Sequence, residues 1–73
     1  MESLYYLFLQ FVDRNGELHL DNFHATRTEI TKHLEHIKRY NPTAIMLFRL
    51  EHISRPPVTV YTLDEGFLPE ITW

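Results

Sequence analysis

Hydrophobic and polar positions divide the chain into short segments, most of which alternate with the two-residue period of a β-strand. The longest apolar run is residues 4–12, LYYLFLQFV, in which only Gln10 is neither aliphatic nor aromatic. Asn15-Gly16 follows this run. An Asn-Gly pair is the strongest short hairpin signal, because both central positions of a type I′ turn require positive φ. Residues 1–23 are therefore predicted to form a β-hairpin.

The pairing register of this hairpin depends on the length of its loop. A two-residue loop places Phe11 opposite Leu20, whereas a three-residue loop with Gly16 as a bulge matches Phe11 with His19. We favour the two-residue loop because it keeps leucines with leucines on the core face, which then carries Tyr5, Leu7, Leu9, Phe11, Leu18 and Leu20. The opposite face then carries Tyr6, Phe8, Gln10, Val12, His19, Asp21 and Phe23.

Residues 26–40 have the pattern of an amphipathic helix. Thr26 followed by Glu29 fits a capping box, in which each side chain binds the backbone N–H of the other residue. The apolar stripe, at i, i+4 and i+7, consists of Ile30, Leu34 and Ile37. Asn41-Pro42 ends the helix, because the residue before a proline avoids the helical region.

Residues 43–63 are predicted to form two further strands. The first half of residues 43–53 is apolar on both alternating faces, which is typical of a central strand. Residues 58–63 form a shorter strand, and the prolines before it suit an edge position. The C-terminal tail, residues 64–73, is rich in apolar side chains and is expected to pack on the domain or on a partner.

The element order ββαββ predicts one small α+β domain over residues 1–73. Its four-stranded, mainly antiparallel sheet would carry the one helix on one face. A chain of 73 residues buries only roughly 60% of its unfolded surface, so its core is a single layer. One helix covers one face of such a sheet. The second face is therefore expected to lie under the tail or to bind a protein, including a second copy of the chain in a homodimer. A third alternative is that its aromatic side chains stack on the bases of single-stranded nucleic acid.

Charge and composition restrict the partners and the cellular compartment. Seven basic and ten acidic residues give a net charge of -3, which disfavours direct binding to nucleic acid. A regulator that contacts nucleic acid through Lys32, Lys38 and Arg39 is the alternative. The absence of cysteine suits a reducing compartment. Without a signal-peptide pattern or an apolar run of about 20 residues, we predict a cytoplasmic protein with no membrane span.

Candidate catalytic and metal-binding residues are few. The chain has two serines, no cysteine, no nucleophile elbow and no glycine-rich phosphate loop, so we predict no enzyme and no cofactor. Glu29, His33 and His36 lie on one side of the predicted helix, but their spacing matches no recognised metal motif. We therefore predict no metal site and keep a metal-dependent enzyme or sensor as an alternative.

In size, acidity and lack of catalytic motifs the chain resembles small phage-encoded inhibitors, anti-CRISPR proteins among them. This is a resemblance of type that no motif carries, and it fits a small accessory subunit of a bacterial complex equally well. It implies a non-enzymatic viral inhibitor or regulator that binds a larger assembly and occludes it sterically. The acidic residues would steer it to a basic surface. The predicted partner-binding residues are Tyr6, Phe8, Phe23, Glu51, Asp64, Glu65, Glu70 and Trp73.

Overall fold

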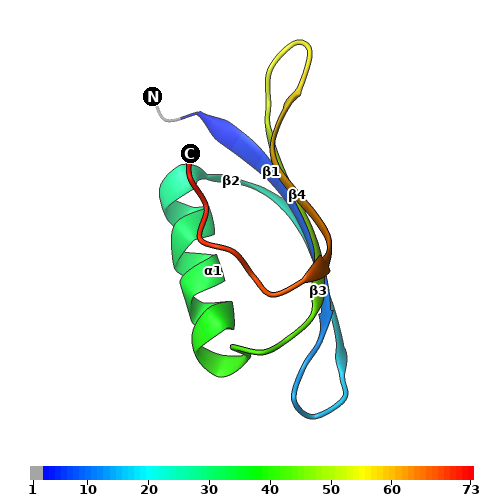
Figure 1. Ribbon diagram of the computed structural model, residues 1–73. Helices are drawn as coiled ribbons and strands as arrows, with labels where there is room; N and C mark the ends of the chain where they lie inside the picture. Colours follow the sequence, from blue (N-terminus) through cyan, green and yellow to red (C-terminus); the bar gives the residue numbers. More distant parts are fainter. Residues whose placement is uncertain (1–2) are drawn as a thin grey trace.

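The computed structural model describes residues 3–73 and confirms the predicted α+β fold (Figure 1). The elements are β1 (Leu4–Val12), β2 (Leu18–Thr26), α1 (Arg27–Tyr40), β3 (Met46–His52) and β4 (Val58–Gly66). The four strands form one antiparallel sheet in the spatial order β2-β1-β3-β4. Helix α1 joins the two hairpins and lies along one face of the sheet. Strands β2 and β4 are the two edges.

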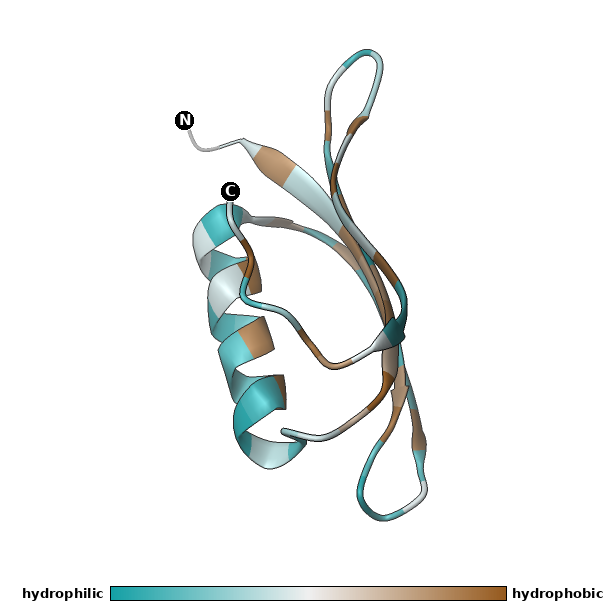
Figure 2. Cartoon of the chain, viewed as in Figure 1, coloured by the Kyte–Doolittle hydropathy of each residue, from teal (hydrophilic) through white to brown (hydrophobic). Residues whose placement is uncertain are grey.

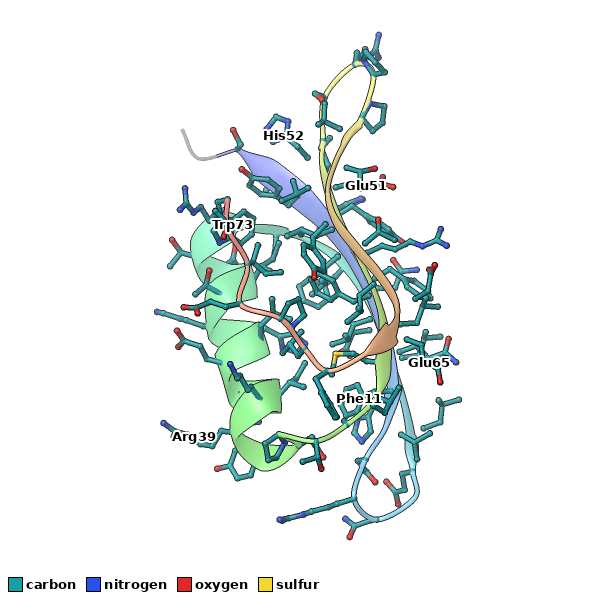
Figure 3. The ribbon with its side chains drawn as sticks, viewed as in Figure 1. Phe11, Arg39, Glu51, His52, Glu65 and Trp73 are labelled. Atoms are coloured by element: carbon teal, nitrogen blue, oxygen red, sulfur yellow. The ribbon has the colours of Figure 1, made fainter. Side chains whose placement is uncertain are left out.

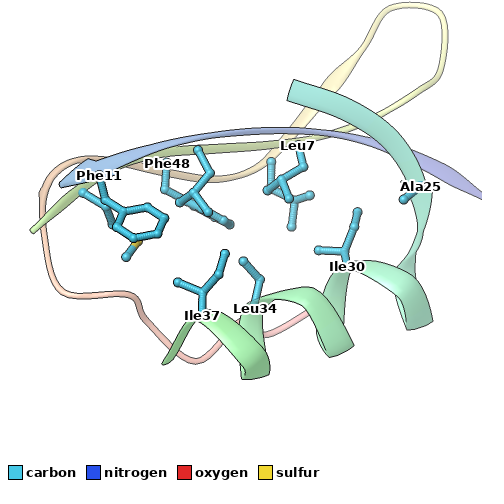
Figure 4. Packing of buried hydrophobic residues seen from close by; sticks show 10 residues of the cluster. Leu7, Phe11, Ala25, Ile30, Leu34, Ile37 and Phe48 are labelled. Atoms are coloured by element: carbon cyan, nitrogen blue, oxygen red, sulfur yellow. The ribbon is translucent and has the colours of Figure 1, made fainter. Parts of the chain in front are cut away.

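The core lies between α1 and the sheet (Figure 4). Alternate residues of the two central strands point toward the helix, as the two-residue period requires. Burying side chains of this size stabilises the fold by about 1.5–3 kcal/mol each. The buried residues are Leu7, Leu9 and Phe11 from β1, Ala25 from β2, Ile30, Leu34 and Ile37 from α1, and Met46, Phe48 and Leu50 from β3.

Helix α1 begins with the predicted capping box. The Glu29 backbone N–H donates to Thr26 Oγ1 at 3.3 Å, and the Thr26 backbone N–H donates to Glu29 Oε1 at 3.0 Å. At the other end the Asn41 N–H donates to the Ile37 carbonyl at 2.8 Å. Lys38 and Arg39 in the last turn complement the negative end of the helix dipole. Both predicted helix ends are therefore confirmed to within one residue.

The β1–β2 turn differs from the favoured prediction. Asp13 and Glu17 enclose a three-residue loop, in which the Gly16 N–H donates to the Asp13 carbonyl at 3.0 Å and Gly16 has φ 83°. Asp13 Oδ1 also accepts the backbone N–H groups of Asn15, at 2.8 Å, and Glu17, at 2.9 Å. These bonds stabilise a turn followed by a glycine bulge. The two-residue register is therefore wrong, and the three-residue alternative is confirmed.

This change of one residue reverses the two faces of β2, because strand side chains alternate. Phe11 pairs with His19 rather than with Leu20. Leu18 and Leu20, expected in the core, are 64% and 61% exposed on the face turned away from the helix. Phe23, expected on that second face, instead packs beside the core, with its ring edge-on to His33 at 5.2 Å.

The C-terminal tail packs along α1 on the helix-facing side of the sheet (Figure 1). Its apolar side chains Leu68, Ile71 and Trp73 border the core. The Trp73 ring stands edge-on to Tyr5, with ring centroids 4.8 Å apart, and the Arg27 guanidinium lies 5.3 Å from its centroid. The tail therefore shields the side of the sheet that already has the helix.

Candidate functional site

The face of the sheet turned away from α1 is the candidate site, and we call it the open face. Within residues 3–73 neither the helix nor the tail lies over it (Figure 2). The pairing of the strands brings the alternate positions of all four onto this face. They are Tyr6, Phe8, Gln10 and Val12 from β1, Leu18, Leu20, Asn22 and His24 from β2, Leu47, Arg49 and Glu51 from β3, and Thr59 and Thr62 from β4.

One end of the open face, beside the β1–β2 turn, is apolar. Leu20 and Leu47 flank Gln10 in one row across three strands, and Val12 lies opposite Leu18 in the next row. Ile45 comes two residues before Leu47 and is 49% exposed. We call this group the apolar patch: Phe8, Val12, Leu18, Leu20, Ile45 and Leu47.

The other end of the open face is polar. His24, Tyr6, Glu51 and Thr59 form one row across the sheet, and the Tyr6 and His24 rings lie 5.4 Å apart. Arg49 stands two residues from Glu51 on the same face, and neither forms an ion pair with another residue of the range 3–73. Both charges are therefore available to a partner.

The structure brings only some of the predicted partner-binding residues together. Tyr6, Phe8 and Glu51 lie on the open face, and Glu65 points to the same side of the sheet (Figure 3). Asp64 is exposed near the end of β4. The remaining three lie elsewhere, since Phe23 and Trp73 pack beside the core and Glu70 belongs to the tail next to α1.

Sequence reasoning missed the β2 part of the apolar patch because it assigned Leu18 and Leu20 to the core. A signal for the correct register was present at Asp13 and Gly16. Aspartate at the first position of a type I turn and glycine at the fourth are both favoured, and Asp13 and Gly16 are three positions apart, as these two places in the turn require. This spacing indicates the three-residue loop, and with it the outward direction of both leucines.

The histidines and carboxylate considered as metal ligands on α1 have separate partners. The Glu29 carboxylate accepts from Thr26, whose backbone N–H and hydroxyl hold its pKa below the usual value. His33 Nε2 lies 2.9 Å from Asp21 Oδ2, and the His36 ring contacts Tyr40 at 4.8 Å. The three residues do not converge on one point.

A second group of possible ligands lies at the β1–β2 turn. Ligand atoms of Asp13, Glu17 and His19 all lie within 4.8 Å of one another. His19 Nε2 is 2.7 Å from Asp13 Oδ2, and its ring stacks on Phe11 at 4.9 Å. The pKa of the Asp13 carboxyl is lowered most by the hydrogen bond from the Glu17 backbone N–H. The hydrogen bond with the His19 side chain is the next largest cause. The turn itself accounts for these contacts, because each of them holds the three-residue loop in shape.

An open groove of about 720 Å³ lies between α1 and the tail. Lys32 and Lys38 border it on the helix together with Glu35, and Glu70 borders it on the tail. The two cations are thus interleaved with acids, as on a solvated surface.

The chain matches no protein-family model, no curated protein and no solved structure. Within residues 3–73, no helix has the length and apolar character needed to cross a membrane.

Proposed function

We propose that the protein is a non-enzymatic binding module whose open face docks on a protein partner. The observation that carries this proposal is the apolar patch, which no element of residues 3–73 covers. Contiguous exposed apolar surface with a polar border is typical of interaction sites. Leu18 and Leu20 are more than half exposed, and burial of each against a partner would contribute about 1–2 kcal/mol.

The shape of the open face favours a protein over a small molecule. Small-molecule sites are concave and bury most of the ligand. One hollow of the structure is lined by α1 and the tail, and a second by the β1–β2 turn with the segment before β3. The centre of the open face borders neither, so it suits a broad and complementary protein surface.

The polar end of the open face supplies the kind of residues that border protein interfaces. Tyrosine and arginine are enriched in such contacts, and Tyr6 and Arg49 lie here. Glu51, Asp64 and Glu65 add exposed or half-exposed negative charge nearby. We infer that they steer the protein toward a basic surface by long-range attraction.

The mode of action we propose is steric occlusion of a larger assembly in the cytoplasm. Docking of the open face would act by occupying a surface of that assembly and so excluding its other ligands. Small phage-encoded inhibitors of the anti-CRISPR type work in this way, and the absence of cysteine suits a reducing compartment.

The test is a pull-down from lysate of the natural host with the wild-type protein and two matched variants. Leu20→Ser removes an apolar side chain of the patch, and Val58→Ser removes one of similar exposure on β4, outside the patch. We expect one assembly to be retained by the wild type and by Val58→Ser and to be lost by Leu20→Ser. Circular dichroism checks that all three are folded. Retention of the same assembly by both variants would overturn the proposal.

A further inference from the structure

The two edges of the sheet are protected to different degrees. Strand β4 follows Pro56-Pro57, and its pairing with β3 has two register shifts, which twist and interrupt an edge. Strand β2 pairs with β1 without a break from Leu4↔Thr26 to Val12↔Leu18. It is nine residues long and contains no proline and no lysine. Strand β2 therefore lacks the prolines, lysines and register shifts that protect many edges, and its one charged side chain, Asp21, is paired with His33.

The turn determines which backbone groups of β2 point outward. The Asp13 N–H donates to the Glu17 carbonyl, so these two residues form a hydrogen-bonded pair of the ladder. Because such pairs alternate along antiparallel strands, the odd-numbered residues of β2 bond to β1. The N–H and C=O groups of Leu18, Leu20, Asn22 and His24 then point away from the sheet. Within residues 3–73 no hydrogen bond besides the ladder engages them.

The flank of α1 beside this edge carries little net charge, because its carboxylate, Glu29, is engaged by Thr26 in the capping box. His33 contacts Asp21 and Phe23 of β2, which places its side of the helix next to the edge. His36 lies on the same flank three residues after His33, and Tyr40 lies there seven residues after His33. Tyr40 is 49% exposed. The lysines at 32 and 38 instead border the groove with the tail.

We infer that two copies of the chain form a dimer in which the β2 strands pair antiparallel across a two-fold axis. The occupant of the edge is a second copy, because the same edge offers both donors and acceptors to its symmetry mate. An axis through Asn22 sets Leu20 of one copy opposite His24 of the other, with no like charges face to face. An axis through Asp21 would oppose two carboxylates, which is unfavourable.

This pairing produces one continuous eight-stranded sheet. The helix flanks bearing His33, His36 and Tyr40 meet across the axis on one side. On the other side the two open faces join into a single surface. The dimer does not depend on the proposed function, since it is formed by the backbone of an edge strand.

Two proline variants test the dimer by sedimentation equilibrium. Asn22→Pro removes an outward N–H of β2, and Thr62→Pro removes the corresponding outward N–H of β4, since Tyr61 and Leu63 face β3. Neither N–H is used by the sheet of one copy. We expect a wild-type dimer, a dissociation constant raised about tenfold or more by Asn22→Pro, and no change with Thr62→Pro. A monomeric wild type, or a dimer unaffected by Asn22→Pro, would overturn the inference.

Disulfide trapping gives an independent measurement because the chain has no cysteine. Asn22→Cys places two thiols opposite each other at the axis, within the range of about 4.4–6.8 Å between Cα atoms that a disulfide spans. We expect covalent dimers on mild oxidation of Asn22→Cys but not of Thr62→Cys. Cross-linking of Thr62→Cys alone would contradict the assignment of the edge. A Leu47→Ser variant should keep the dimer while losing the partner, so failure of either proposal can be recognised separately.

Discussion

The two faces of the sheet differ in solvent exposure although they are formed by the same strands. On the helix-facing side Leu7, Leu9 and Phe48 are 0% exposed, and no polar or charged residue of the range 3–73 is buried. On the open face apolar residues alternate with these and remain half-exposed beside Arg49 and Glu51. The chain thus carries more apolar surface than one core uses. Its stability and the proposed docking of its open face should therefore be separable by mutation.

The largest effect is expected from matched aromatic truncations on the two faces. Phe48→Ala leaves a cavity in the core and should cost about 3–5 kcal/mol, enough to unfold a domain this small. Phe8→Ala, on the half-buried opposite side, should cost about 1 kcal/mol. Urea denaturation followed by circular dichroism measures both. Equal losses in the free energy of unfolding would show that both faces contribute equally to the core.

The tail extends the covered side, and its removal should have an intermediate effect. Trp73→Ala removes the edge-to-face contact with Tyr5 and the contact with Arg27. We expect a loss of about 2 kcal/mol, less than for a fully buried aromatic residue. Phe67→Ala, in the same tail but 62% exposed, is the control and should change little. Thermal unfolding compares the two, and similar melting temperatures would contradict the packing of Trp73.

The turn that separates the two faces of β2 should depend on pH through Asp13. Its pKa lies below the usual 3.8, so the ionised form stabilises the fold at neutral pH. This contribution is present above pH 3.8 and is lost as the pH falls through the lowered pKa. The stability gap between wild type and Asp13→Asn should therefore be widest at neutral pH and close in acid. A gap independent of pH, measured by urea denaturation against Asp64→Asn, would remove this role.

The smallest effect on stability is expected from the apolar patch. Leu20→Ser should change the free energy of unfolding by no more than about 0.5 kcal/mol, because Leu20 is 61% exposed. A larger loss of unfolding free energy in a dilute, monomeric sample would show that Leu20 belongs to the core. It would contradict the difference in burial between the two faces. Differential scanning calorimetry makes this measurement.

Local patterns were sufficient to predict the elements and the helix. The capping box at Thr26 and the proline at 42 act within one turn of the chain, so the residues that form each signal are neighbours. The stripe of Ile30, Leu34 and Ile37 likewise defines its own buried side. Order and type of the elements followed from these signals.

The direction of the β2 side chains could not be read from hydrophobicity. Both registers bury an apolar β1, and pairing leucines with leucines is reasonable in the absence of other information. Polar atoms of the turn determine the pairing register, because Asp13 Oδ1 accepts two backbone N–H groups of the three-residue loop. The helix-facing side then accommodates His19 and Asp21 because each finds a polar partner. The β2 part of the candidate site was missed for this reason.

The length of the β1–β2 loop also limits how this chain can change. Removal of one residue from positions 14–16 would rotate β2 by half its period. Leu18 and Leu20 would turn toward the helix and Phe23 away from it. Deletion of one codon would thus exchange the buried and the exposed residues of the whole strand, although no residue of the strand itself is replaced. Insertions and deletions in this loop are therefore expected to change the composition of the apolar patch as strongly as substitutions within the patch.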